Sequence, residues 1–266
     1  MRNLVFLLAL LSSPVIAHEF WIEPFAYELE PGGKLQGELV NGQFFEGVKL
    51  PFRKESFHQF IQIRGDETAP VRAWPGSRPA LDVDPIGTGL IVVAYQSGLS
   101  RVAYESFEEF ASFAEHKDFP DIEKRHAELG YPLANFAEIY TRYAKTLVAV
   151  GDGAGSDRRV GLEAEIVALS NPYRDELNEG MRVQVFYGDE VRAKAQVEVF
   201  DKAPDGTVEI TRYRTDAEGT VAIPVKPGHR YLVDSVVLRV PAPEIAQERS
   251  AAWETLWASL TFAVPD

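Results

Sequence analysis

The most distinctive candidate for chemistry in this sequence is a histidine placed where an export signal would be removed. Val15-Ile16-Ala17 puts small or branched residues at the positions that a signal peptidase recognises, and His18 follows directly. A histidine at a chain start offers both its α-amine and its imidazole Nδ1, so a single residue forms a bidentate chelate. The α-amine has a pKa of roughly 8 against about 10.4 for Lys, so freeing it for a metal costs little near neutral pH. This donor pair suits Ni, Co or Cu.

The residues before His18 have the features of a signal peptide. Arg2 supplies the positive start, Leu4 to Leu11 is an apolar run, and Ser12, Ser13 and Pro14 end it. The run is far shorter than the roughly 20 residues that span a bilayer. We therefore expect cleavage after Ala17, a periplasmic location and a mature chain that does not span a membrane. An uncleaved N-terminal anchor is the alternative.

The other four histidines, His58, His116, His126 and His229, make no recognisable motif. His116 and His126 are too far apart for the i, i+4 metal spacing of a helix, so both are expected on solvated helix faces. The sequence has no Cys, which excludes thiolate ligands and cysteine nucleophiles and leaves nitrogen and oxygen donors. Nucleophile-elbow, phosphate-loop and zinc-protease patterns are also missing from the sequence. We expect a protein that is not an enzyme.

The charge balance limits the partners. Lys and Arg number 27 against 40 Asp and Glu, a formal net charge of −13. Loss of Arg2 with the signal would make it −14 (−13 − 1). Such a field repels nucleic acid and anionic lipid and attracts cations.

The residue pattern predicts a mainly β protein. Short apolar runs broken by turn residues fill positions 20–104 and 160–266, which is typical of antiparallel sandwiches. Between them, Phe107, Phe110 and Phe113 have helical spacing, and a Gly-rich linker follows at 151–159. The predicted fold class is two immunoglobulin-like β-sandwiches with a helical insert between them. The expected organisation is a signal peptide (1–17), an N-terminal sandwich (18–105), a helical insert (106–150) and a C-terminal immunoglobulin-like sandwich (160–266).

A third helix is predicted within that insert, starting at Asn135. Tyr140, Tyr143 and Leu147 would then form one buried face, since residues three and four apart are neighbours on a helix. Lys145 would lie at the edge of that face, with its stem buried and its ammonium against Glu163, Glu165 or a loop carbonyl. We expect Lys145 to have a structural role, because a cation beside a metal raises the electrostatic cost of binding.

Several runs resemble one family of exported bacterial proteins, a domain of unknown function whose members are often described as periplasmic components of nickel or cobalt uptake. The similarity starts with Ala17-His18-Glu19-Phe20-Trp21, continues with Tyr140-Thr141-Arg142-Tyr143-Ala144-Lys145, and ends with Trp253 to Phe262, which includes Trp257. The resemblance implies a metal ligand at His18. Similar proteins tend to have a His where Val237 stands here. In its place, Glu165 or Asp234 would complete the metal site, or the site would bind a metal more weakly or not at all.

Three functions follow as hypotheses. In the first, the chain is a periplasmic accessory protein that presents Ni, Co or Cu to an inner-membrane transporter. In the second, His18 and His58 form a copper histidine brace of an oxidase, with Tyr27 or Tyr95 nearby. In the third, the sandwiches bind protein or glycan without a metal, and Trp21 serves packing alone, because a Trp close to a chain end usually anchors that end.

Overall fold

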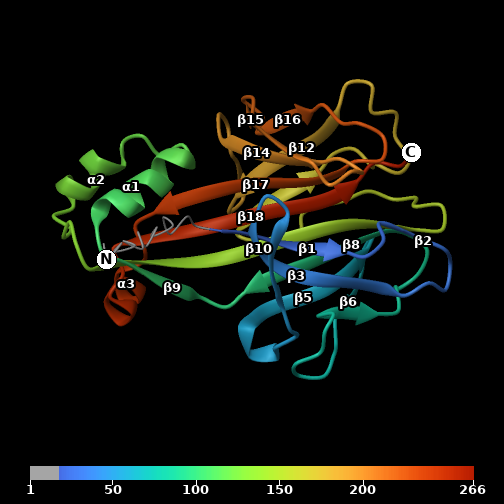
Figure 1. Ribbon diagram of the computed structural model, residues 1–266, viewed down its shortest axis with the longest axis horizontal. Helices are drawn as coiled ribbons and strands as arrows, with labels where there is room; N and C mark the ends of the chain where they lie inside the picture. Colours follow the sequence, from blue (N-terminus) through green and yellow to red (C-terminus); the bar gives the residue numbers. More distant parts are fainter. Residues whose placement is uncertain (1–17) are drawn as a thin grey trace, which may run out of the picture.

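The structure of this protein is a computed structural model that describes residues 18–266 (Figure 1). The predicted signal peptide, residues 1–17, lies outside the described residues. The predicted mainly β class is confirmed: three sheets are stacked, and one of them runs through the whole molecule. Within residues 18–266, no helix is both long and apolar enough to cross a bilayer.

The central sheet has ten strands and forms the middle layer. Its order is β15 (Val208–Arg214), β14 (Gln196–Lys202), β17 (Arg230–Arg239), β18 (Trp253–Ala263), β10 (Phe136–Val150), β8 (Gly89–Ser97), β5 (Phe57–Arg64) and β6 (Glu67–Pro70), with β2 (Glu28–Leu29) and β9 (Ser100–Tyr104) also paired to β10. β10 and β18 are parallel, and both are buried along nearly their whole length.

Two smaller sheets and three helices complete the fold of residues 18–266. The N-terminal sheet contains β1 (Glu19–Pro24), β3 (Leu35–Gln43), β4 (Glu46–Leu50) and β7 (Leu81–Val83). The C-terminal sheet contains β11 (Ala164–Ala168), β12 (Met181–Tyr187), β13 (Glu190–Val191) and β16 (Thr220–Ile223). The helices are α1 (Phe107–His116), α2 (Ile122–Glu128) and α3 (Pro243–Arg249), and a short 3-10 turn covers Lys54–Ser56.

Residue alternation along the central strands assigns each face of the central sheet to a different core. In β10, Tyr143 and Leu147 face the C-terminal sheet, whereas Ala144 and Val148 face the N-terminal sheet. The N-terminal sheet covers only part of its face of the central sheet. The helix α1 covers another part of the same face, where Phe110 and Phe113 stack on Trp253 and Trp257 of β18. Figure 1 shows α1 and α2 together at one end of the long central strands.

The predicted third helix, starting at Asn135, is wrong, because the residues that follow Asn135 form the 15-residue strand β10. Tyr140 and Tyr143 would share one side of a helix, but in a strand residues three apart point to opposite faces. Tyr143 packs in the core under the C-terminal sheet, and the half-buried Tyr140 packs on the α1 side. A strand with both faces covered loses its polar–apolar alternation, so its apolar residues fitted the helical period by chance.

The predicted helical insert therefore shrinks to α1 and α2. The buried face of α1, with Phe107, Phe110 and Phe113, lies where the spacing predicts it. The two predicted sandwiches also share a sheet: strands from 18–105 (β5, β8) and from 160–266 (β14, β17, β18) join through β10.

Trp21 tests how strongly β1 is held. It is fully buried, and its ring meets Phe45 edge-on at 5.8 Å between centroids. We expect Trp21→Ala to lower the free energy of unfolding by about 3–5 kcal/mol, the usual cost of truncating a buried Trp. Denaturant unfolding followed by circular dichroism measures this. Trp74→Ala is the matched control, since Trp74 is 85% exposed. Equal stability losses in both variants would show that Trp21 does not anchor β1.

Candidate functional site

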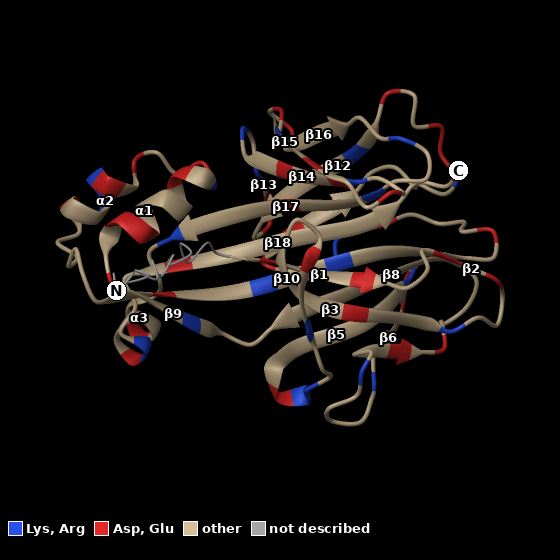
Figure 2. Ribbon diagram, in the orientation of Figure 1, with Lys and Arg blue, Asp and Glu red and all other residues tan. Residues whose placement is uncertain are grey.

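A row of polar side chains crosses the central sheet on the side that α1 and the N-terminal sheet cover. Glu198 of β14 pairs across the strands with Asp234 of β17, and Asp234 pairs with Ser259 of β18. Their strand neighbours Val197, Val199 and Val233 face the opposite core. Alternation thus directs two carboxylates and a hydroxyl to the same face, inside a protein layer rather than into solvent. Figure 2 shows charged positions within these central strands as well as on the loops.

Lys117 and Glu19 close over this row from two directions. Lys117 directly follows α1, and its Nζ donates to Glu19 Oε1 at 2.9 Å, Glu198 Oε2 at 2.7 Å and Asp234 Oδ2 at 3.0 Å. The Lys117 side chain is only 3% exposed, and its three partners are equally buried. Its Nζ also lies 5.1 Å from the centre of the Trp257 ring. We call Glu19, Lys117, Glu198 and Asp234 the Lys117 cluster.

The electrostatics of the cluster follow from burial, from the Lys117 ammonium and from the hydrogen bond of His116. Burial raises the pKa of Asp234 to about 6, although Lys117 works against it. Burial acts the same way on Glu198, but the hydrogen bond from His116 and the charge of Lys117 outweigh it and bring the pKa of Glu198 to about 2. Burial alone would lower the pKa of Lys117, yet its three carboxylate neighbours raise it above the ordinary value. Lys117 is therefore a fixed cation.

Arg142 of β10 brings a second cation to the same face. Its guanidinium lies 4.0 Å from the centre of the Trp257 ring and 4.9 Å from that of Tyr140. Burial lowers its pKa, which the charges of Tyr140, Asp234, Glu138 and Glu19 partly offset. Among the residues that the structure describes, Arg142 Nη1 and Asp234 Oδ1 are buried without a hydrogen-bond partner. These two atoms keep bonding capacity that the cluster does not use.

The cluster reaches the surface through Glu198. Its Oε1 accepts from His116 Nε2 at 3.1 Å and from Arg212 Nε at 3.2 Å. Arg212 Nη2 also donates to His116 Nδ1 at 2.8 Å, which assigns the ring proton to Nε2. The His116 side chain is 43% exposed, so one imidazole lies between the buried acids and solvent.

His18 precedes the cluster directly along the chain. It is exposed, but β1 begins at the next residue, and that residue is the buried Glu19 bound to Lys117. The terminus expected after cleavage is therefore attached to a strand fixed by pairing with β3 and by an ion pair. The backbone of His18 has little freedom to move away from the cluster.

The other predicted ligands divide between the two faces of the central sheet. Asp234 lies in the Lys117 cluster, in contact through Lys117 with Glu19, the neighbour of His18. Glu165 is on β11 under the opposite face, where it binds Lys145. The structure thus brings Asp234, and not Glu165, to the His18 side. Val237 also packs in the opposite core, so a His at this position would point away from Asp234.

Lys145 has the kind of contacts that its position predicts, although on a strand. Its Nζ donates to Glu165 Oε1 at 3.1 Å, to the carbonyl of Arg158 at 3.1 Å and to Asp157 Oδ2 at 2.8 Å. Asp157 also accepts from the backbone N–H of Ala168. These bonds attach the segment after β10 to β10 itself and to β11.

The remaining residues of the second hypothesis, His58, Tyr27 and Tyr95, make none of the hydrogen bonds of the Lys117 ammonium. His58 is exposed on β5, Tyr27 is buried, and the Tyr95 ring lies 5.0 Å from that of Phe20.

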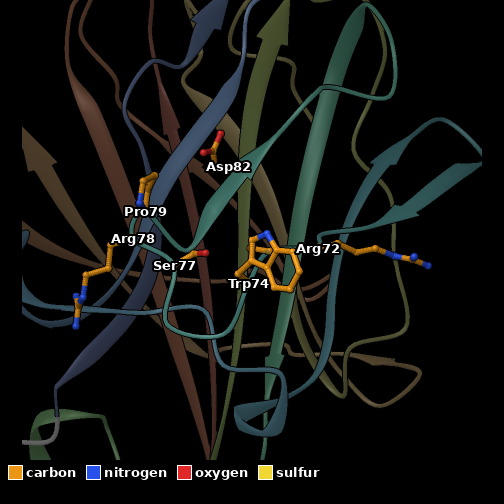
Figure 3. A pocket seen from close by; sticks show the side chains of 7 residues that line it. Arg72, Trp74, Ser77, Arg78, Pro79 and Asp82 are labelled. Carbon is orange, nitrogen blue, oxygen red and sulfur yellow. The ribbon is translucent and has the colours of Figure 1, made fainter.

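A surface pocket of about 520 Å³ lies around Trp74, with Arg72, Arg78 and Asp82 in its lining. Figure 3 shows Arg72 and Arg78 extending away from Trp74 in opposite directions, so they do not converge on one ligand.

Sequence reasoning missed most of the Lys117 cluster and misplaced one histidine. Glu19, Lys117 and Glu198 resemble the many surface charges of an acidic chain. The available signal was the position of Glu198 between Val197 and Val199, where a charge interrupts an apolar strand. His126, expected on a solvated face, is fully buried: its Nε2 lies 2.9 Å from the carbonyl of Pro132, and Trp253 Nε1 donates to its Nδ1 at 3.0 Å.

The fold and site define a layered β protein organised around buried lysine–carboxylate clusters. A family model described as "Domain of unknown function (DUF4198)" matches residues 15–238, and the chain belongs to this family. No curated protein matches the chain. Among solved structures, the tetra-tandem repeat in the extending region of a large adhesion protein is 10% identical with a TM-score of 0.20. That alignment covers 92% of this chain and 49% of the other, so the chain spans about half the length of that structure.

Substitution of Lys117 tests whether the cluster depends on this one cation. Lys117→Met would leave Glu19, Glu198 and Asp234 buried together without the ammonium. We expect the free energy of unfolding to fall by about 3–5 kcal/mol, as when one partner of a buried ion pair is removed. Denaturant unfolding provides the measurement. Lys124→Met is the matched control, because the Lys124 side chain is 75% exposed and pairs only with Glu128 at 3.8 Å. A Lys117→Met protein as stable as the control would contradict this role.

Proposed function

We propose that this chain is an exported protein of the periplasm that binds a divalent transition metal, Ni, Co or Cu, at His18 and passes it to an inner-membrane transporter without catalysing a reaction. The observation that carries the proposal is the position of His18 directly before the buried, ion-paired Glu19. Signal cleavage after Ala17 would create an α-amine next to an imidazole on a backbone that β1 already holds in place.

The donor set favours the terminal nitrogens over the buried acids. Glu19, Glu198 and Asp234 present oxygens within 4.8 Å of one another, a spacing that could suit a cation. The Lys117 ammonium lies between them at 2.7–3.0 Å, so a metal there would meet a positive charge at contact distance. His18 is exposed, and its two nitrogens suit Ni, Co or Cu.

We propose His116 as the source of a second imidazole. His116 is the residue before Lys117, and His18 is the residue before Glu19. Because Lys117 and Glu19 are hydrogen-bonded to each other, the two histidines flank the same ion pair in sequence. Its half-exposed ring is hydrogen-bonded to Glu198, and a carboxylate partner of this kind orients an imidazole ligand and raises its basicity. Metal binding by His116 would displace Arg212 from Nδ1.

Metal titration of the mature protein tests the proposal. Calorimetric titration with Ni²⁺, Co²⁺ and Cu²⁺ should give at least one saturable site on protein that begins at His18. One extra residue before His18 removes the free α-amine from the chelate. We expect it to weaken binding by at least about tenfold, or about 1.4 kcal/mol. His18→Ala should have a similar effect, and His116→Asn should have a smaller one.

The matched control is His58→Ala, which removes another exposed imidazole far along the chain. Its metal affinity should equal that of the unsubstituted protein. Unchanged affinity in both the extended and the His18→Ala proteins would remove His18 from the site. N-terminal sequencing of protein recovered from the periplasm should begin with His18, and any other start would contradict the chelate.

A further inference from the structure

The second buried lysine, Lys145, is positioned differently from Lys117. Its Nζ lies 2.7 Å from Oδ1 and 2.8 Å from Oδ2 of Asp157, so it is about equally close to both oxygens of this carboxyl group. The side chains of Lys145, Asp157 and Glu165 are at most 1% exposed. Water is thus excluded from an amine and a carboxyl group in contact.

We propose that Lys145 and Asp157 form an intramolecular amide bond, with Glu165 carrying the proton. Lys145 Nζ lies 3.1 Å from Glu165 Oε1, so the nitrogen is within hydrogen-bond reach of both acids. The reaction class is a condensation between an amine and a carboxylic acid inside a folded protein. It requires no cofactor.

The step balances without an external reactant. A proton passes from the ammonium of Lys145 to Asp157, which leaves a neutral amine facing a neutral carboxyl group. The lone pair of Nζ attacks Cγ of Asp157, and a bond from nitrogen to carbon forms. Glu165 takes a second proton from the nitrogen and delivers a proton to the departing oxygen, which leaves as water. The products are an amide, one water molecule and an unchanged Glu165, with no change in oxidation state.

The surrounding backbone is arranged to assist this step. The N–H of Arg158 donates to Asp157 Oδ1 at 2.8 Å, and the N–H of Ala168 donates to Oδ2 at 2.8 Å. These donors would stabilise the negative charge that develops on oxygen as the nitrogen attacks. The N–H groups of Val160 and Leu162 hold the Glu165 carboxyl in place at 2.9 Å and 3.3 Å.

Burial also supplies a driving force. In water, amide formation from an ammonium and a carboxylate is unfavourable, because water solvates both charged reactants. Inside the fold that solvation is absent, and condensation replaces a buried ammonium and a buried carboxylate by one neutral group. The Lys117 cluster lacks this geometry, because its ammonium touches a single oxygen of each of three acids and remains a cation.

Mass spectrometry of the denatured protein tests the bond. The folded chain should weigh one water molecule less than the mass calculated from its measured N-terminus. Proteolysis should yield one fragment in which the peptides containing Lys145 and Asp157 are joined. Asp157→Ala and Lys145→Arg should show the full calculated mass. An unmodified mass for the folded, unsubstituted protein, with separate Lys145 and Asp157 peptides, would overturn the proposal.

Glu165→Gln tests the proton carrier, since it keeps both reacting side chains. It should fold and show the full mass. Glu163→Gln is the matched control. Glu163 is close to Glu165 in sequence, but its half-exposed side chain pairs with Arg239, so its substitution should leave the mass deficit intact. A deficit that persists in Glu165→Gln would overturn the assignment of Glu165. Because the unsubstituted protein alone decides whether the bond exists, a variant that fails to fold does not prevent the test.

Discussion

The contact between Lys117 and three buried carboxylates is the interaction on which the arrangement of the layers depends. Glu19 belongs to β1, Glu198 to β14 and Asp234 to β17, while Lys117 ends α1. One ammonium therefore joins the N-terminal sheet, the helical cap and the central sheet. Apolar packing alone would allow these three parts to slide, because it is not directional. The hydrogen bonds of one buried cation specify a single position for each of them.

Each face of the central sheet carries one such lysine. Lys117 lies on the face that α1 and the N-terminal sheet cover, and Lys145 lies on the face under the C-terminal sheet. The sequence contains no Cys, so disulfides cannot connect the layers. A buried ion pair such as that of Lys117 contributes little net stability by itself, because desolvation offsets its attraction. Its value here is positional: it fixes how strands distant in sequence meet.

How far the sequence predicts this structure depends on how many faces of each element are covered. The α1 helix was predictable because Phe107, Phe110 and Phe113 mark one buried stripe against a polar surface. β10 was not, because Tyr140 and Tyr143 are both packed but on opposite faces, and a period of two cannot be seen when both faces are apolar. This segment is a strand because it pairs with β8 and β18, and β18 lies far away in the sequence.

The candidate site was predictable only where a charge interrupts an apolar strand. Asp234 lies within Tyr231 to Val237, and such an acid must find a partner or lose its charge. The other members of its cluster are residues 19, 117 and 198, and no local pattern connects these positions. Lys117 in particular follows a helix whose direction is set by the stacking of Phe113 on Trp257. The contact of the ammonium with the acids is therefore a consequence of tertiary packing.

The proposed signal cleavage would change the charge of the His18 nitrogen, which is directly followed by an acid of the Lys117 cluster. Glu19, Glu198 and Asp234 are the three acids of this face, and Glu19 is bound to Lys117 directly after His18 in the chain. In a precursor the nitrogen of His18 is a neutral amide, whereas cleavage would convert it into an amine one residue from Glu19. The acids then lower the cost of placing a positive charge at the terminus, whether that charge is a proton or a metal ion.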